Sequence, residues 1–214
     1  MCLIALTMHA HKCLVSESQL DTDESGYVDL GLSVKWATCN LGAIQPEEFG
    51  DYYAWGETET KENYNWSVYI WCNGSHDSLT KYNTSGSYGS VDNKTVLDEV
   101  DDVANAKLGG RWRMPTDAEW TELRTKCTWT WTTQNDVNGY MVTSKINGNS
   151  IFLPAAGYRI YTYLSDTGTD GYYWSSSLDM EHLYYARNIY FNSGGVYRYG
   201  NYRFNGYSVR PVSK

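Results

Sequence analysis

The chain has 214 residues, 42% of them hydrophobic, which is enough for one large domain with its own core and is typical of a globular rather than a disordered protein. Its formal net charge of −8 argues against a nucleic-acid partner, because neutralising phosphates takes a basic face. No apolar run approaches the roughly 18 residues of a membrane-spanning helix, so direct membrane insertion is not expected.

The predicted elements begin after an N-terminal arm. Residues 1–25 lack the basic region of a signal peptide and end in a polar stretch, so we expect a mobile arm or a helix packed elsewhere. Residues 27–38 alternate and predict one or two strands, and residues 50–56 predict a short aromatic strand. Residues 57–94 are polar and aperiodic. They predict a long irregular insertion that is either functional or packed by its own aromatic residues.

Two helices are predicted next. Residues 98–107 carry acidic side chains early and a lysine late, and two glycines follow, as the helix dipole and a glycine cap favour. Thr116 and Glu119 form a capping box at the start of the second helix. Three apolar side chains then share one face of this helix: Trp120, Leu123 and Cys127.

The rest of the chain predicts strands separated by Gly, Asn and Asp turns. The dipeptide Asn147-Gly148 is a strong signal for a two-residue hairpin turn. The predicted strands cover residues 139–143, 150–154, 172–176, 186–191, 196–199 and 208–212. The fold class is therefore α+β, with two helices, mixed antiparallel sheets and long irregular loops.

Five cysteines occur at wide spacing, without the CxxC or CxxH pairs of a structural zinc site. Their odd number favours free buried thiols over a disulfide framework. One bridge among Cys39, Cys72 and Cys127 is the alternative.

The most unusual feature of the chain is its C-terminal segment. Nine of the 36 positions from Tyr172 to Tyr207 are tyrosine, interleaved with Ser, Gly, Asn and Arg. Tyrosine gives large, rigid, amphipathic contact area, and the small polar residues give adaptable hydrogen bonding. A core would use aliphatic residues and Phe instead, because a buried phenol needs a hydrogen-bond partner. The composition therefore predicts a recognition surface.

Acidic and basic residues are also distributed unevenly along the chain. Residues 1–181 contain twelve basic and 25 acidic side chains, whereas residues 182–214 contain five basic and no acidic ones. This predicts a locally positive surface on an acidic body. The alternative is that the arginines pair with carboxylates elsewhere in the fold. That interpretation suits Arg203 and Arg210 better than Arg187 and Arg198, which lie among the tyrosines.

Four ordered motifs give the chain a resemblance to a known family. They are GGRWRMPT at 109–116, LPAAGYR at 153–159, GYYWSSS at 171–177 and SVRPV at 208–212, and residues 27–37 and 50–55 match as well. This order resembles the C-type-lectin-like domains of gut bacteria and their phages. It is close to the Fibrobacter succinogenes major paralogous domain and to the variable proteins of diversity-generating retroelements. The resemblance spans roughly residues 26–212.

The resemblance implies a C-type lectin fold over residues 26–214 and a C-terminal variable region, residues 179–207, that a retroelement rewrites by miscopying template adenines. It implies a non-enzymatic ligand-binding protein at a cell surface, secreted or in a phage virion, with a protein or glycan as its macromolecular ligand. The expected ligand-binding residues are Glu181, His182, Tyr184, Tyr185, Arg187, Tyr190, Tyr197, Arg198, Tyr199, Tyr202 and Tyr207. The alternative is a non-diversified carbohydrate-binding or structural module of a bacterial surface protein.

In and around residues 179–207, scaffold residues alternate with the positions that are expected to vary. The scaffold residues are Ser177-Leu178, Ala186, Asn188-Ile189, Phe191, Ser193, Val196, Arg203, Gly206 and Ser208–Val212. Strand periodicity places Tyr197 and Tyr199 on one face with Val196 on the other, and turns Tyr190 outward if its neighbours point inward. The alternative is that these tyrosines are simply the wet face of a sheet.

Signals for catalysis are weak. Formylglycine-generating enzymes share the implied fold and use a late pair of cysteines, but no cysteine follows Cys127. His76 and His182 stand apart from any nucleophile motif. Glu57 and Glu59 could be paired acids of a glycosidase, although two glutamates in a polar loop are usually solvated. The calcium signatures of true C-type lectins do not appear. We therefore expect no cofactor and no metal, with a structural ion held by loop carboxylates left open.

Overall fold

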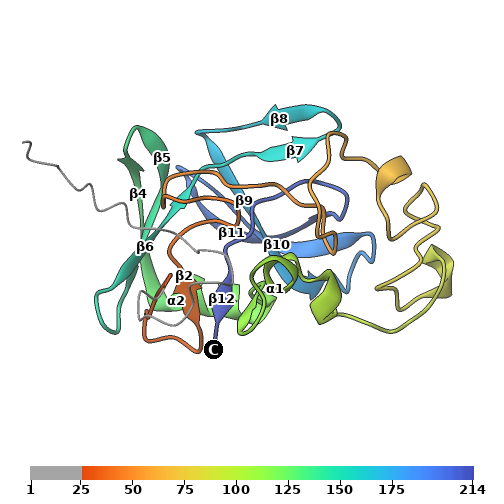
Figure 1. Ribbon diagram of the computed structural model, residues 1–214, viewed down its shortest axis with the longest axis horizontal. Helices are drawn as coiled ribbons and strands as arrows, with labels where there is room; N and C mark the ends of the chain where they lie inside the picture. The colour runs from red at the N-terminus through yellow and green to blue at the C-terminus, as the bar shows by residue number, and fades with distance from the viewer. Residues whose placement is uncertain (1–25) are drawn as a thin grey trace, which may run out of the picture.

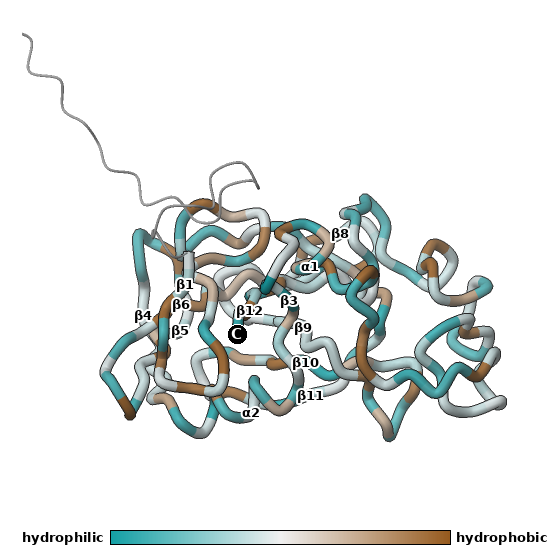
Figure 2. Tube along the Cα trace, turned by 60° about the horizontal axis from the view of Figure 1, so that its bottom comes forward, coloured by the Kyte–Doolittle hydropathy of each residue, from teal (hydrophilic) through white to brown (hydrophobic). Residues whose placement is uncertain are grey.

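The computed structural model describes residues 26–214 as an α+β protein built largely from antiparallel strands in small sheets (Figure 1). The prediction for residues 1–25 lies outside this range. Along the longest axis, the sheet β4-β5-β6 occupies one end and the insertion of residues 57–94 occupies the other, with β9 to β11 between them (Figures 1 and 2). The insertion carries no long hydrophobic run in Figure 2, in keeping with its irregular course.

Four sheets are present among the described residues. One has the order β1-β2-β12-β3, with β1 Tyr27–Val28, β2 Lys35–Ala37, β12 Val212–Ser213 and β3 Trp112–Arg113. Another contains β4 Cys127–Gln134, β5 Val137–Ser144 and β6 Ser150–Pro154. The third has the order β11-β10-β9, with β9 Asp170–Leu178, β10 Tyr185–Asn192 and β11 Gly195–Tyr202. The fourth pairs β7 Tyr158–Ile160 with β8 Tyr163–Ser165.

The second helix, α2 Asp117–Lys126, is confirmed with its capping box. The first helix, α1 Val103–Leu108, begins later than predicted, and Glu99–Asp101 forms a 3₁₀ turn before it. The reason is Asp102, whose carboxylate accepts hydrogen bonds from the amides of Ala104 and Asn105 and so acts as the N-cap. The acidic residues that were predicted to form the first turn of this helix therefore precede it, and the last of them, Asp102, is its N-cap.

Three strand predictions need correction. Residues 50–56 form no strand, because only Tyr53 makes a bridge there, to Tyr207. Regular pairing at the C-terminal end is limited to β12, although residues 208–212 read as a strand. The hairpin at Asn147 is confirmed, but its loop is longer than two residues, since the Ser144 amide bonds to the carbonyl of Asn149. The side-chain amide of Asn147 donates a hydrogen bond to the carbonyl of Asp29, at 2.9 Å.

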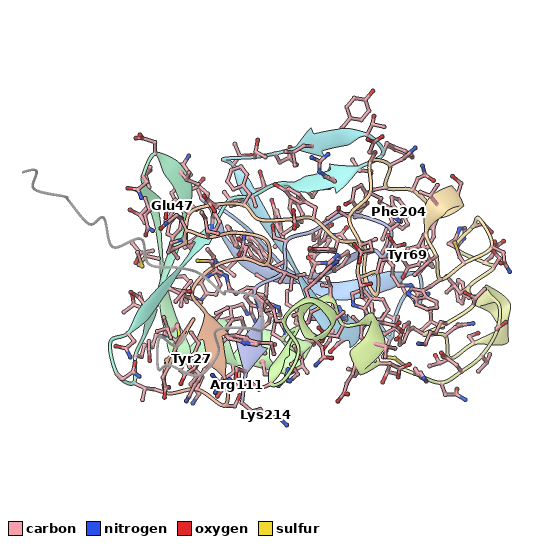
Figure 3. The ribbon with its side chains drawn as sticks, in the orientation of Figure 1. Tyr27, Glu47, Tyr69, Arg111, Phe204 and Lys214 are labelled. Carbon is pink, nitrogen blue, oxygen red and sulfur yellow. The ribbon has the colours of Figure 1, made fainter. Side chains whose placement is uncertain are left out.

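The hydrophobic core combines aliphatic and aromatic side chains, and two of its clusters concern the C-terminal segment. The first packs Trp36 and Trp120 against Ile189 and Phe191, the inner face of β10. The second joins Trp55 and the insertion to the end of the chain. A smaller cluster holds Tyr69 against Phe204, and the two side chains lie near each other in Figure 3. The insertion is therefore packed onto the C-terminal segment, not suspended in solvent.

The thiols of Cys72 and Cys127 are free and buried, as predicted, and burial raises the pKa of Cys127 to about 11. Cys39 is disulfide-bonded, so the prediction of a free thiol is wrong there. Across residues 26–214, neither helix has the length and apolar character required to cross a bilayer.

Candidate functional site

The C-terminal hairpin carries most of the predicted site. Strands β10 and β11 pair so that Tyr190 lies opposite Tyr197 and Asn188 opposite Tyr199. Tyr197 and Tyr199 are 47% and 56% exposed, whereas Ile189 and Phe191 on the other face of the hairpin are fully buried. The predicted division of this hairpin into an outer and an inner face is confirmed.

The outer face forms a tyrosine ladder, by which we mean Tyr172, Tyr190, Tyr197 and Tyr199. Tyr190 is the centre of this ladder, since its ring centroid lies 4.9 Å from that of Tyr172, 5.8 Å from that of Tyr197 and 6.3 Å from that of Tyr199. Contacts at these distances with tilted or offset rings are favourable for aromatic pairs. The ladder therefore runs from a half-buried base on β9 to two exposed rings on β11.

Tyr190 is fixed by hydrogen bonds as well as by packing. Its hydroxyl donates to Oδ1 of Asp170 at 2.7 Å and accepts from the side-chain amide of Asn192 at 2.6 Å. Burial and the bond to Asp170 raise the pKa of Tyr190 to about 12. Among the described residues, the hydroxyls of Tyr197 and Tyr199 have no such partners, which leaves them available to a ligand.

A second group of rings lies at the other end of the hairpin. Tyr184 contacts Tyr185 at 4.7 Å and Tyr202 at 6.0 Å, and His182 contacts Tyr184 at 5.9 Å. The insertion adds three rings to this group that the sequence prediction missed. We call the whole group the end cluster: Trp66, His76, Tyr88, His182, Tyr184, Tyr185 and Tyr202.

The contribution of the insertion to the end cluster is specific. His76 lies 5.3 Å and Tyr88 5.7 Å from the ring of Tyr184, and Trp66 lies 6.1 Å from that of Tyr202. The sequence held one hint of this arrangement, the aromatic residues of an otherwise polar loop. Their partners were out of reach of pattern analysis because more than 90 residues separate the two segments.

The prediction of a positive surface is wrong, because the exposed Arg198 and the partly buried Arg187 are both paired with carboxylates. Arg198 donates from Nε to both carboxylate oxygens of Asp117, at 2.6 and 2.8 Å. Arg187 lies 3.2 Å from the carboxylate of Asp179 and 3.5 Å from that of Glu181. The register places Arg187 and Arg198 on the opposite face from Tyr197 and Tyr199, the face that packs toward α2. These arginines therefore do not extend the tyrosine ladder.

Arg203 and Arg210 are buried and have no carboxylate partner among the described residues. This is the reverse of the expectation that these two arginines, more than Arg187 and Arg198, pair with carboxylates. Arg210 donates to the carbonyls of Ala37, Thr38 and Phe152, and burial lowers its pKa to about 10. Arg203 is 0% exposed, donates from Nη1 to two carbonyls, and packs over the rings of Trp55 and Tyr69. Both side chains hold the end of the chain to the rest of the domain.

Tyr207 was predicted to bind ligand, and the structure contradicts this. It is 1% exposed and stacks on Trp174 with ring centroids 4.1 Å apart. Its backbone bonds in both directions with Tyr53, which turns the side chain into the second core. Composition alone did not separate this core phenol from the exposed ones nearby.

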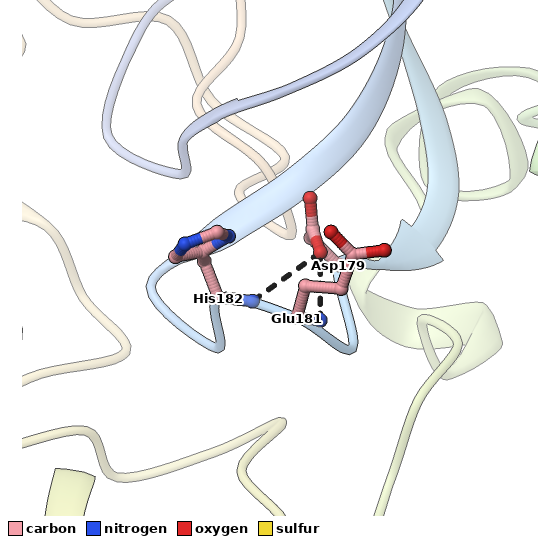
Figure 4. A group of neighbouring side chains, drawn as sticks. All are labelled: Asp179, Glu181 and His182. Atoms are coloured by element: carbon pink, nitrogen blue, oxygen red, sulfur yellow. Dashed lines mark hydrogen bonds between the residues drawn. The ribbon is translucent and has the colours of Figure 1, made fainter.

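Asp179, Glu181 and His182 are close enough to hold a metal ion (Figure 4). The buried Asp179 carboxylate already accepts hydrogen bonds from the amides of Glu181 and His182, at 2.8 and 3.3 Å. Arg187 supplies a positive charge beside both carboxylates. We therefore assign no metal to this group, and describe it as a turn closed by an ion pair.

Comparisons with known proteins add one finding. Residues 125–212 match a family model described as a domain of unknown function, DUF8237. The match covers less than half of the chain and includes β4 to β11, and with them the tyrosine ladder. Comparison with curated proteins and with solved structures gave no match.

Proposed function

We propose that this protein is a non-enzymatic ligand-binding protein with a C-type lectin fold, whose C-terminal tyrosine surface is diversified by a retroelement. It would act at a cell surface, as a secreted protein or in a phage virion, and bind a protein or glycan there. The resemblance in the four motifs supports the proposed family, and the burial pattern of residues 179–207 supports the proposed role of the surface.

One observation carries this proposal: in the C-terminal segment, the scaffold residues are largely buried and the expected ligand-binding residues are largely exposed. The scaffold residues of the C-terminal segment are buried except for Ser177, Ser193 and Val196, and Val196 still packs against the first core. The expected ligand-binding residues are exposed or partly exposed except for Tyr207. Variation at the exposed positions would change the surface without disturbing the core, which is the property a diversified binding site requires.

The surface is suited to binding because it is already ordered. The hydrogen bonds of Tyr190 and the ring contacts of Tyr184 hold the bases of both aromatic groups. Less conformational entropy is then lost when a ligand binds. Tyr197, Tyr199 and Tyr202 are the exposed rings, and aromatic side chains of this kind often dominate binding energy.

Features of the insertion support a non-enzymatic role. Glu57 is buried against Lys61, with 2.7 Å between the carboxylate and the amine, and its carboxylate also accepts from the amide of Ile70. Glu59 pairs with Lys107 at 2.7 Å. Each carboxylate is thus held by its own lysine, an arrangement unlike two acids that flank a scissile bond.

The experiment compares capture of binding partners by the immobilised wild-type domain and a Tyr197→Ala, Tyr199→Ala variant, from surface extracts of co-resident bacteria. Tyr163→Ala is the matched control, because Tyr163 is an exposed tyrosine of β8 outside residues 179–207. We expect the double variant to lose a partner that the control retains, with melting temperatures within a few degrees. Equal capture by all three proteins would contradict the proposal.

The second candidate function is a non-diversified carbohydrate-binding module. It is favoured by the end cluster, where Tyr184 and Tyr202 stack with an interplanar angle of 29° and could form a platform for sugar rings. A glycan array tests this candidate. Binding of one glycan by the wild-type domain, lost in Tyr202→Ala, together with an invariant locus, would favour it over the first.

A further inference from the structure

A polar cleft lies outside residues 179–207, beside the β7–β8 hairpin. Its volume is about 610 Å³, within the range of small-molecule sites. Its lining includes Asp51, Tyr52, Glu62, Tyr64, Arg159 and Thr162. Neither the tyrosine ladder nor the end cluster contributes to it.

Arg159 is the positively charged group in the lining of this cleft that has no hydrogen-bond or ion-pair partner among the described residues. Its guanidinium packs over the ring of Tyr52 at 5.4 Å and makes no hydrogen bond or ion pair within residues 26–214. Its backbone is fixed by two hydrogen bonds with Gly206, of 2.8 and 2.9 Å. The neighbouring Lys61, by contrast, is bound to Glu57 and to the carbonyl of Val68. A held guanidinium of this kind is suited to a carboxylate, which it can bind through two parallel hydrogen bonds.

The remaining polar groups indicate a ligand that also carries hydroxyls. The Glu62 carboxylate has no hydrogen-bond or ion-pair partner in the part of the chain that the structure describes. One carboxylate oxygen of Asp51 accepts a hydrogen bond from the hydroxyl of Tyr53, and the other is available to a ligand. Two carboxylates next to one free arginine disfavour a phosphate or sulfate dianion and accept hydrogen bonds from hydroxyls. The phenols of Tyr52 and Tyr64 donate to backbone carbonyls and both side chains are buried, so they form the floor of the cleft and leave the polar contacts to its charged residues.

Tyr161 precedes the lining residue Thr162 in the chain and has a strained backbone conformation. It occupies the first position of the two-residue turn between β7 and β8, with a φ of 52° where glycine is favoured. Its amide and carbonyl bond with Tyr64 at 2.8 and 2.9 Å, which holds the strained residue in place, and its side chain is 53% exposed. Residues kept in such conformations recur at ligand sites.

We propose that the cleft binds an acidic sugar of the uronic-acid class. Arg159 binds the carboxylate, Asp51 and Glu62 accept hydrogen bonds from the sugar hydroxyls, and the ring of Tyr161 lies against the sugar. This site is independent of the tyrosine surface and goes beyond the function proposed for that surface.

The test is calorimetric titration of the full chain with D-glucuronate, with D-glucose as the neutral match and acetate as the carboxylate without a ring. We expect saturable binding of glucuronate alone. Arg159→Met should weaken it by about ten-fold or more, the loss of one charge-assisted contact. Arg111→Met is the matched control, because Arg111 packs over Tyr27 in the same way, at 5.2 Å and away from the cleft (Figure 3).

Two further variants keep the test decisive. Tyr161→Gly should weaken glucuronate binding while leaving the melting temperature equal or higher, because glycine relieves the strained φ. The Tyr197→Ala, Tyr199→Ala variant should bind glucuronate as the wild type does, so failure of this proposal is separate from failure of the proposed function. The proposal is overturned by no binding, by glucose or acetate binding as tightly as glucuronate, or by unchanged affinity in both Arg159→Met and Tyr161→Gly.

Discussion

Tyr190 and Tyr197 face each other across β10 and β11, with ring centroids 5.8 Å apart and planes inclined by 24°. The two rings differ in their other contacts. The hydroxyl of Tyr190 donates a hydrogen bond to Asp170. The hydroxyl of Tyr197 has no hydrogen-bond partner among the described residues, and its side chain is 47% exposed. An anchored ring thus supports an exposed one, so this tyrosine surface has a structural layer beneath a layer open to solvent.

The buried end of the segment is expected to determine stability. Tyr207→Ala should lower the free energy of unfolding by about 3–5 kcal/mol, because it removes a large ring packed on Trp174. Tyr207→Phe should cost less, about 1–3 kcal/mol, since it keeps the ring and leaves the amide of Asn205 without its acceptor. Urea denaturation of both variants measures the difference. A neutral Tyr207→Ala would show that this phenol is not part of the core.

The ion pair between Arg198 and Asp117 is expected to matter little for folding. Arg198 is a partly exposed side chain, and exposed pairs are worth about 0.2–1 kcal/mol. A double-mutant cycle with Arg198→Ala and Asp117→Asn should give a coupling energy in that range, smaller at high salt. A coupling above about 2 kcal/mol would make Arg198 a structural residue and remove it from the positions free to vary.

The insertion is expected to share in ligand binding through the end cluster. His76→Ala should weaken capture of the partner that Tyr202→Ala also weakens, because His76 packs against Tyr184, next to Tyr202. Its exposed side chain should leave the melting temperature within a few degrees of wild type. Val100→Ala, a change at an exposed residue outside both aromatic groups, serves as the control. If His76→Ala and the control behave alike in capture, the insertion is only a structural support.

Alkaline pH is expected to unfold the domain through its buried phenols. Burial raises the pKa of Tyr173 to about 12, and burial together with Asp170 does the same for Tyr190, against an ordinary value of 10.0. The unfolded chain then loses these protons first, so their stabilisation is complete below pH 10 and is lost as the pH rises toward 12. Circular dichroism and phenolate absorbance should therefore change together above pH 10. Full ionisation of the phenols with the fold intact would contradict this.

Much of the fold was accessible from the sequence because local signals determined it. The capping box at Thr116 and the alternation around Ile189 and Phe191 are short-range patterns, and both elements appear where predicted. The start of α1 was missed because Asp102 is used twice, as an N-cap and as an acceptor for the amide of Met114. Only the second contact shows why that carboxylate is buried.

The site was predictable on the hairpin and not beyond it. Period-two alternation separates Tyr197 and Tyr199 from their buried neighbours, but it carries no information about Tyr207, whose orientation follows from pairing with Tyr53. The arginine partners were missed for the same reason, because Asp117 lies 81 residues from Arg198. Contacts between residues that lie far apart in the sequence therefore decide which tyrosines and arginines of this segment are buried and which stay exposed.

The central claim, a diversified surface on a fixed scaffold, is tested most directly by sequencing this locus from several isolates. The account predicts amino-acid changes at exposed positions such as Tyr197, Tyr199 and Tyr202, none at Ile189 or Phe191, and a reverse transcriptase gene with a near-identical template repeat nearby. Changes spread evenly over buried and exposed positions, or an invariant segment without a reverse transcriptase gene, would contradict it.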